Sequence, residues 1–200
     1  MSLRGLALRT FLWLPPCFAA WFAVAAWHAE VAAWLAWGVI GLVAPGAVGS
    51  FERSGAIVAF TTTGEIAVAA GQMGVLVPEV NALSYLYGLP LFAALVLGSR
   101  APLRQLALGA IALLPVQAFG IAMGCLAQLV AHGSAAAGSA GLVGWRVEAV
   151  VLGFQLGSLI LPGAAPILLW CAWNRRLIRP EPQPPRSADA PGSAAPARTP

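Results

Sequence analysis

The stretch that decides how the chain is threaded through a membrane is residues 31–49, VAAWLAWGVIGLVAPGAVG. It is nearly apolar enough to cross a bilayer, and a crossing here would reverse the side on which every later loop lies. The question is one of membrane topology because only 9% of the 200 residues are charged and the mean hydropathy is +0.81. A soluble domain carries about 25% charged residues, so we predict a membrane protein.

Four other stretches can cross a membrane, since about 20 apolar residues span the hydrocarbon core. They cover residues 11–27, 83–99, 106–131 and 149–173. The first also resembles a signal peptide, with Val24-Ala25-Ala26 as a passable cleavage site. We predict an uncleaved helix, and cleavage would leave the sides of the later loops unchanged.

The arginines decide whether residues 31–49 cross, because basic residues gather in cytoplasmic loops. If the N-terminus is cytoplasmic and 31–49 does not cross, Arg53 and Arg146 are outside and nine arginines are inside. The nine are Arg4, Arg9, Arg100, Arg104, Arg175, Arg176, Arg179, Arg186 and Arg198. A fifth crossing would put Arg100 and Arg104, or the arginines after residue 174, on the wrong side. We therefore predict a multi-pass membrane protein with both termini cytoplasmic.

Residues 28–82 form the one sizeable segment outside lipid on this topology. Its apolar first half, 31–49, is predicted to lie in the interface or to re-enter the bilayer. In its second half, β-branched runs at 55–63 and 74–80 are bounded by Gly and Pro and predict two or three strands, with 66–70 ambiguous.

The predicted fold class is an α-helical integral membrane protein. Its membrane domain, residues 1–179, has about four transmembrane helices, with an interfacial helix and a small extracytoplasmic β-containing element between the first two. The proline-rich residues 180–200 predict a disordered cytoplasmic tail.

The third and fourth spans carry a packing motif of glycines and amides. The predicted helix-packing or partner-binding residues are Gln117, Gly120, Gly124, Gly153, Gln155, Gly157 and Ser158. At 100° per residue the first three share one face of the third span, and Gly153 and Gly157 share one face of the fourth. Small residues let helix backbones approach in lipid. We predict that the two glycine faces meet, leaving Gln155 and Ser158 for the second span or for another protein.

The sequence contains no motif for a metal or another cofactor and no paired carboxylates, so we predict no cofactor. No Asp, Glu, Lys or Arg falls inside a predicted span, which disfavours a carrier or channel. The arginines do not indicate a nucleic-acid partner, because they sort by membrane side. The predicted partners are the bilayer and membrane proteins. An alternative is a minimal membrane thiol peptidase or transpeptidase, because Cys125, His132 and Arg146 all lie near the predicted outer face and a thiolate needs a base or a cation.

Three blocks of sequence resemble the exosortase H-associated membrane proteins over about residues 10–179. They are VNALSYLYGLPLF at 80–92, ALLPVQA at 112–118, and GFQLGSLILP at 153–162 followed by Ala165-Pro166 and Asn174-Arg175-Arg176. The resemblance implies a small bacterial inner-membrane protein that accompanies exosortase H. That enzyme is expected to act as a membrane transpeptidase on proteins with a C-terminal sorting signal.

Exosortases themselves use Cys, Arg and His, and this chain has fewer spans and lacks their cysteine motif. The resemblance therefore implies a non-enzymatic accessory subunit. Its expected partner is exosortase H or another polytopic membrane protein, or the sorting helix of the substrate.

Overall fold

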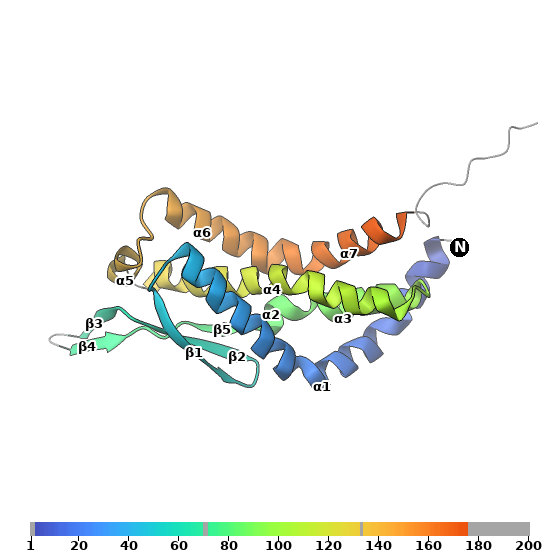
Figure 1. Ribbon diagram of the computed structural model, residues 1–200, viewed down its shortest axis with the longest axis horizontal. Coiled ribbons are helices and arrows are strands. Elements are labelled where there is room, and N and C mark those ends of the chain that lie inside the picture. The colour runs from blue at the N-terminus through green and yellow to red at the C-terminus, as the bar shows by residue number, and fades with distance from the viewer. Residues whose placement is uncertain (1–2, 70–71, 133, 176–200) are drawn as a thin grey trace, which may run out of the picture.

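The computed structural model describes residues 3–69, 72–132 and 134–175 (Figure 1). Its first element, helix α1, runs without interruption from Leu3 to Val43. The separate interfacial helix predicted within residues 31–49 is therefore wrong, because most of that stretch continues α1. Because the helix does not turn back after Trp27, residues 31–49 do not form a return crossing. This agrees with the number of crossings inferred from the arginines.

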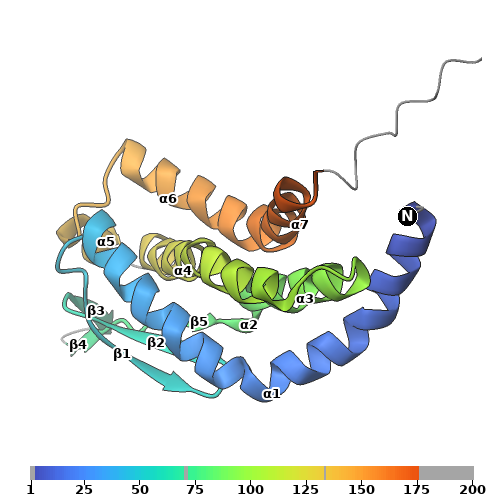
Figure 2. The ribbon, with the colours of Figure 1, turned by 45° about the vertical axis from the view of Figure 1, so that its right-hand side comes forward.

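Helix α1 continues past Trp27 because nothing in the chain stops it. No Gly or Pro occurs between Pro16 and Gly38, and the stretch is rich in Ala, the best helix former. The polar residues His28 and Glu30, which lie just after the predicted first span, both find partners elsewhere in the fold. The helix is bent rather than straight (Figure 2), and the adjacent Pro15 and Pro16 inside it account for a bend because each lacks a backbone N–H.

Five short strands follow α1 and lie beside its second half (Figure 1). They are β1 Val48–Ser54, β2 Ile57–Thr62, β3 Glu65–Ala69, β4 Gln72–Val75 and β5 Glu79–Asn81. β1, β2 and β5 form an antiparallel sheet with β2 in the centre, and β3 and β4 form a hairpin. The strand expected at 55–63 is present as β2, and the ambiguous stretch 66–70 largely belongs to β3. The stretch 74–80 is divided between β4 and β5, and β1 was not anticipated. Gly55, at φ +62°, occupies the turn between β1 and β2, where a tight hairpin needs a positive φ.

The rest of the described chain is helical. It comprises α2 Leu83–Leu86, α3 Gly88–Gly98, α4 Leu103–His132, α5 Ser134–Ser139, α6 Trp145–Gln155, the π-helical turn η1 Leu156–Ile160, and α7 Leu161–Trp173. Helix α4 lies in the middle of the bundle, and the start of α1 and the end of α7 lie at the end of the molecule away from the strands (Figures 1 and 2).

Three helical segments of the described residues are long and apolar enough to cross a membrane. They are Arg4–Val43, Leu103–His132 and Trp145–Trp173. The segment Leu83–Gly98 is apolar but shorter, about 24 Å at 1.5 Å per residue against a hydrocarbon core of about 30 Å. The chain is thus a membrane protein with several apolar helices, and the fourth crossing at 83–99 stays a prediction.

The core is made mainly by small residues of α1 and larger ones of α4. Ala25, Ala29, Ala33 and Ala36 recur on one face of α1 and are buried in the same cluster as Ile121 of α4 and its neighbours. A second cluster joins α3, α4 and α7 at the opposite end of the bundle. Its buried members are Phe92, Val96, Leu113 and Trp170.

Helix α4 and the turn η1 approach until their backbones touch. A Cβ added to Gly157 would lie 2.8 Å from the Cα of Gly120. The widened turn η1 directly precedes Pro162, which cannot donate a backbone hydrogen bond, and the N–H of Leu161 reaches back to the carbonyl of Leu156. This close approach fixes how α6 and α7 sit on α4.

Replacing Gly157 with alanine tests this backbone contact. The new methyl group would meet the backbone of Gly120, which can yield only if the helices separate. Overpacking of this kind costs about 1–3 kcal/mol. We expect Gly157→Ala to lower the midpoint of thermal unfolding of the detergent-solubilised protein by several degrees.

Gly41→Ala in α1 is the matched control, because nothing lies within 4 Å of a Cβ at that position. Alanine favours the helix over glycine by about 1 kcal/mol, so the control should keep or raise the midpoint. An unchanged midpoint for Gly157→Ala would contradict the packing described here.

Candidate functional site: a groove beside the strands

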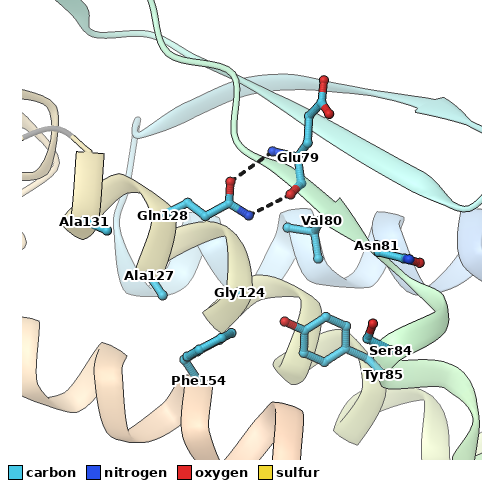
Figure 3. Close-up of a pocket in the computed structure, with 10 residues that line it drawn as sticks. All are labelled: Glu79, Val80, Asn81, Ser84, Tyr85, Gly124, Ala127, Gln128, Ala131 and Phe154. Carbon is cyan, nitrogen blue, oxygen red and sulfur yellow. Dashed lines mark hydrogen bonds between the residues drawn. The ribbon is translucent and has the colours of Figure 1, made fainter.

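A groove of about 350 Å³ opens where β5, α2, α4 and α6 come together (Figure 3). Helix α4 forms its floor, β5 and α2 form one wall, and α6 contributes Phe154 from the other side. The lining residues are Glu79, Val80, Asn81, Ser84, Tyr85, Gly124, Ala127, Gln128, Ala131 and Phe154. The groove combines apolar side chains with the edge of a sheet.

Two glycines of α4 make room for an aromatic ring beside the groove. A Cβ on Gly120 would lie 2.6 Å from Cδ1 of Tyr85, and a Cβ on Gly124 would lie 2.5 Å from the Tyr85 hydroxyl. The ring of Tyr85 therefore occupies the space that two side chains would otherwise fill. This contact docks α2 on α4 and directs the Tyr85 hydroxyl toward Gly124 on the groove floor.

Gln128 closes the edge of β5 in the way a further strand would. Its Oε1 accepts a hydrogen bond from the backbone N–H of Glu79 at 3.2 Å, and its Nε2 donates to the carbonyl of Glu79 at 2.6 Å (Figure 3). Val80 pairs with Val58 across the sheet, so the backbone groups of Glu79 point away from β2 and toward α4. One side chain thus fastens the small sheet to the helix bundle.

Three polar groups at the groove have no partner within the described chain. They are the hydroxyls of Ser84 and Tyr85 and the carboxylate of Glu79. Oδ1 of Asn81 accepts a hydrogen bond from the N–H of Leu83. Together with Phe154 and the two alanines, these groups suit a polypeptide segment, which offers both amides and apolar side chains.

The predicted packing residues fall into an inward and an outward set. Gly120 and Gly157 lie against each other, and Gly153 faces Met123 of α4, where a Cβ would lie 2.8 Å from its sulfur. Gly124 faces Tyr85 rather than α6. Gln117 is buried in the bundle.

The outward set lies on α6 and η1. Gln155 is exposed and its side chain makes no hydrogen bond to a described residue. Ser158 is half-buried and its hydroxyl donates to the carbonyl of Phe154 at 2.7 Å. Pro162, one turn further on, packs against Gly88 at the start of α3. On this outward side, Pro162 therefore contacts α3, whereas Gln155 faces away from the bundle.

A family profile described as "Exosortase H-associated membrane protein" matches residues 1–177. The chain belongs to this family. Comparison with curated proteins and with solved structures gives no match. Two of the sequence blocks that carry the resemblance meet at the groove, since residues 80–92 supply Val80 to Tyr85 and residues 153–162 supply Phe154.

Sequence reasoning missed the polar link that joins the helices of this exosortase H-associated protein. The indole N–H of Trp21 donates to Nδ1 of His28 at 3.1 Å, and Nε2 of His28 lies 2.9 Å from Oε1 of Gln117. If Nδ1 accepts, Nε2 carries the proton and donates to Gln117. Nε2 of Gln117 in turn donates to the carbonyl of Leu86 at 3.4 Å. The signal in the sequence was a single histidine inside an apolar helix, which needs a partner.

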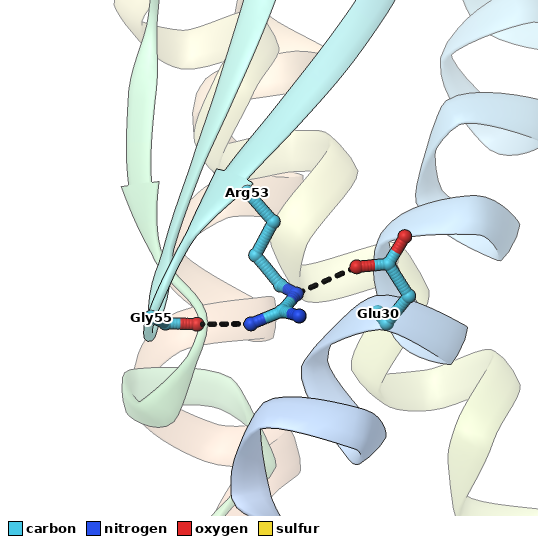
Figure 4. A network of polar contacts seen from close by, with 3 residues as sticks. All are labelled: Glu30, Arg53 and Gly55. Atoms are coloured by element: carbon cyan, nitrogen blue, oxygen red, sulfur yellow. Dashed lines mark hydrogen bonds and ion pairs between the residues drawn. The ribbon is translucent and has the colours of Figure 1, made fainter.

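A second polar link fastens the sheet to α1. Nε of Arg53 in β1 lies 2.6 Å from a carboxylate oxygen of Glu30, and its Nη1 donates to the carbonyl of Gly55 at 3.0 Å (Figure 4). Arg53 therefore ties the β1–β2 turn to the middle of α1. The sequence predicted only the outer position of Arg53 and not its partner.

The residues of the alternative thiol site are not brought together. Cys125 is fully buried among the apolar residues of the core. His132 lies two turns further along α4, where its Nδ1 is 3.1 Å from the carbonyl of Gln128, and Arg146 donates to the carbonyl of Gly141. Within the described residues no three His, Cys, Asp or Glu side chains could hold a metal ion.

Gln128→Ala tests whether this side chain holds the sheet. The change removes the partner of the N–H and carbonyl of Glu79, and an ordinary hydrogen bond is worth about 0.5–1.5 kcal/mol. We expect faster hydrogen exchange at Glu79, which contributes the affected N–H, measured by mass spectrometry, with exchange in α1 unchanged.

Gln155→Ala serves as the control, because Gln155 has no partner in the described chain and its loss should leave exchange in the strands as it is. Equal exchange at residue 79 in the Gln128→Ala variant and the natural protein would show that other contacts hold the sheet.

Proposed function

We propose that this protein is a non-enzymatic accessory subunit of an exosortase H protein-sorting system in the bacterial inner membrane. It binds exosortase H, or the C-terminal sorting helix of the exosortase's substrate, through the outward face of α6 and η1. Membership of the family supports the association with exosortase H, and the chemistry of this face supports its place in the complex.

The observation that carries the proposal is the unpaired amide of Gln155. Among the glutamines whose side chains the structure describes, Gln105, Gln117 and Gln128 all bond within the chain, and Gln155 does not. A hydrogen-bonding group that faces lipid without a partner costs free energy. A polar group on a partner helix would remove that cost.

The surroundings of Gln155 favour a helix as the partner. The neighbouring side chains on the outward face are large and exposed, among them Leu152, Leu156 and Leu159. An apolar surface with one amide fits a membrane helix that offers apolar side chains and one polar group. The amide then fixes the register of the pair, which apolar packing alone would leave loose in lipid.

The groove beside the strands supplies a second contact outside the bilayer. It lies on the same side of α4 as α6, and Phe154, the neighbour of Gln155, lines it. A partner seated on the outward face of α6 can therefore extend a segment over the groove. The unpartnered hydroxyls of Ser84 and Tyr85 are suited to the backbone of such a segment.

The topology that we propose places the strands outside the cytoplasm. Arg4, Arg100, Arg104 and Arg175 all belong to the end of the bundle opposite the strands, and clustering of arginines marks a cytoplasmic end. In this topology α2 and α3 together form one short crossing. The number of crossings is then even, so α7 ends on the side on which α1 begins.

Cysteine accessibility tests this orientation. Ser50→Cys in β1 should react with a membrane-impermeant maleimide added to intact spheroplasts, and Ala101→Cys between α3 and α4 should react only after permeabilisation. The natural protein, in which Cys17 and Cys125 are buried and Cys171 is half-buried, gives the background. Labelling of position 101 in intact spheroplasts would reverse the orientation.

Co-purification tests the partner. The tagged protein, extracted in a mild detergent from membranes that contain exosortase H, should recover the exosortase. Gln155→Leu should lower the recovery roughly 3- to 30-fold, because one interhelical hydrogen bond is worth about 0.6–2 kcal/mol.

Ser158→Ala is the matched control. Its hydroxyl already bonds to the carbonyl of Phe154 on the same helix, so its removal should leave recovery unchanged. Failure of the natural protein to recover exosortase H or its substrate would sink the proposal, and equal recovery with Gln155→Leu would remove the assigned face.

A further inference from the structure

The end of the molecule opposite the strands gathers arginines from four separate segments. Arg4 and Arg9 lie near the start of α1, Arg100 lies between α3 and α4, Arg104 lies in the first turn of α4, and Arg175 follows α7. All five are exposed. Figures 1 and 2 show these segments at the same end of the bundle.

Contacts between the residues next to these arginines hold the four segments together. Thr10 of α1 lies against Gly98 of α3, where an added Cβ would be 2.6 Å from the threonine oxygen. The indole N–H of Trp170 in α7 donates to the hydroxyl of Ser99 at 3.1 Å. Asn174 donates to Oε1 of Gln105 in α4 at 3.5 Å. These contacts join the segments that carry the arginines at one end of the bundle.

No carboxylate of the described residues lies at this end to balance the charge. The acids of the described ranges are Glu30, Glu52, Glu65, Glu79 and Glu148. Glu30 pairs with Arg53 beside the sheet, three others belong to strands, and Glu148 lies in the first turn of α6 at the strand end of the bundle. Among the described residues, the carboxylates thus lie away from the end of the bundle that carries Arg100, Arg104 and Arg175.

Arg100 stands where the backbone favours glycine. Its φ is +56°, and it is the one non-glycine residue of the described ranges with a positive φ. The N–H of Arg100 bonds to the carbonyl of Leu97 at 3.1 Å, and the N–H of Ala101 bonds to that of Val96 at 3.0 Å. This pattern ends a helix with a left-handed residue, usually glycine. A guanidinium is therefore present at a position where a residue with a side chain is strained.

We propose that Arg100, Arg104 and Arg175 bind the phosphate of an anionic phospholipid headgroup. Guanidinium groups bind phosphate through paired N–H donors, and arginine clusters at the ends of membrane helices attract anionic lipids. This inference rests on the charged end of the bundle and is independent of the proposed binding of exosortase H.

The apolar surface beside the arginines commits the site to a lipid rather than to free phosphate. Leu103 and Leu108 of α4 and Trp173 of α7 are all exposed next to Arg104 and Arg175. In a membrane these side chains contact acyl chains. A phospholipid can place its phosphate among the guanidiniums and its chains along these residues, whereas inorganic phosphate gains nothing from them.

Thermal unfolding of the full chain in detergent, with phosphatidylglycerol or phosphatidylcholine added, tests the site. Phosphatidylglycerol at ten times its Kd should raise the midpoint by about 3–6 °C, and phosphatidylcholine or inorganic phosphate should not. Arg100→Gly should unfold at a higher temperature than the natural protein without lipid, because glycine accepts the positive φ, and should lose most of the rise with phosphatidylglycerol. If Arg100 had only a structural role, Arg100→Gly would change the unfolding temperature without lipid but would keep the rise with phosphatidylglycerol.

Arg104→Gln leaves the backbone of the turn alone and should also lose most of the rise. Arg146→Gln, at the other end of the bundle, should keep it. The proposal is overturned if both Arg100→Gly and Arg104→Gln keep the full rise, or if inorganic phosphate or phosphatidylcholine produces the same rise as phosphatidylglycerol.

Discussion

The hydrogen-bonded series from Trp21 through His28 and Gln117 to the carbonyl of Leu86 is the interaction on which the arrangement of the bundle depends. Apolar helix faces attract one another little in lipid, since lipid tails are as apolar as leucine, so they do not fix a register by themselves. Each polar group inside the bundle does, because leaving it unpaired is costly. His28 can satisfy both ring nitrogens only if α1 lies beside the middle of α4 and α4 lies beside the end of α2. Once these three elements are set, the alanine face of α1 and the glycines of α4 allow the close packing seen around them.

The same rule explains how the strands are attached and which face of the protein is left open. A small sheet is barely stable alone in water, and here Arg53 ties it to Glu30 of α1 while Gln128 takes the free backbone groups of Glu79. Nearer the arginine-rich end, Trp170 and Asn174 bond to α3 and α4 in the same way. Gln155 differs from Gln105, Gln117 and Gln128, because its amide lies on an apolar outward face with no partner within the described residues. This unpaired amide marks the surface proposed for exosortase H or its substrate.

The sequence predicted the features that depend on local pattern and missed those that depend on distant partners. Composition and the positions of the arginines predicted a membrane protein in which residues 31–49 make no separate crossing. The glycine spacing predicted a contact between faces of the third and fourth spans, where Gly120 and Gly157 lie together. The end of the first helix was misplaced because His28 and Glu30 look like residues at a membrane surface. Their partners stand 89 and 23 positions away in the chain, and no local pattern reveals such a distance. The groove was missed for the same reason, since Gln128 meets Glu79 across 49 positions.

Photocrosslinking from position 155 tests the central claim most directly. A photoreactive amino acid in place of Gln155 in the full chain, irradiated in native membranes, reports what touches the outward face of α6, and the same residue at Leu108 on α4 reports contact with lipid and chance neighbours. We expect an adduct at position 155, absent at position 108, that mass spectrometry identifies as exosortase H or the sorting helix of its substrate. Adducts at position 155 formed only with lipid, or only with a second copy of the chain, would contradict it.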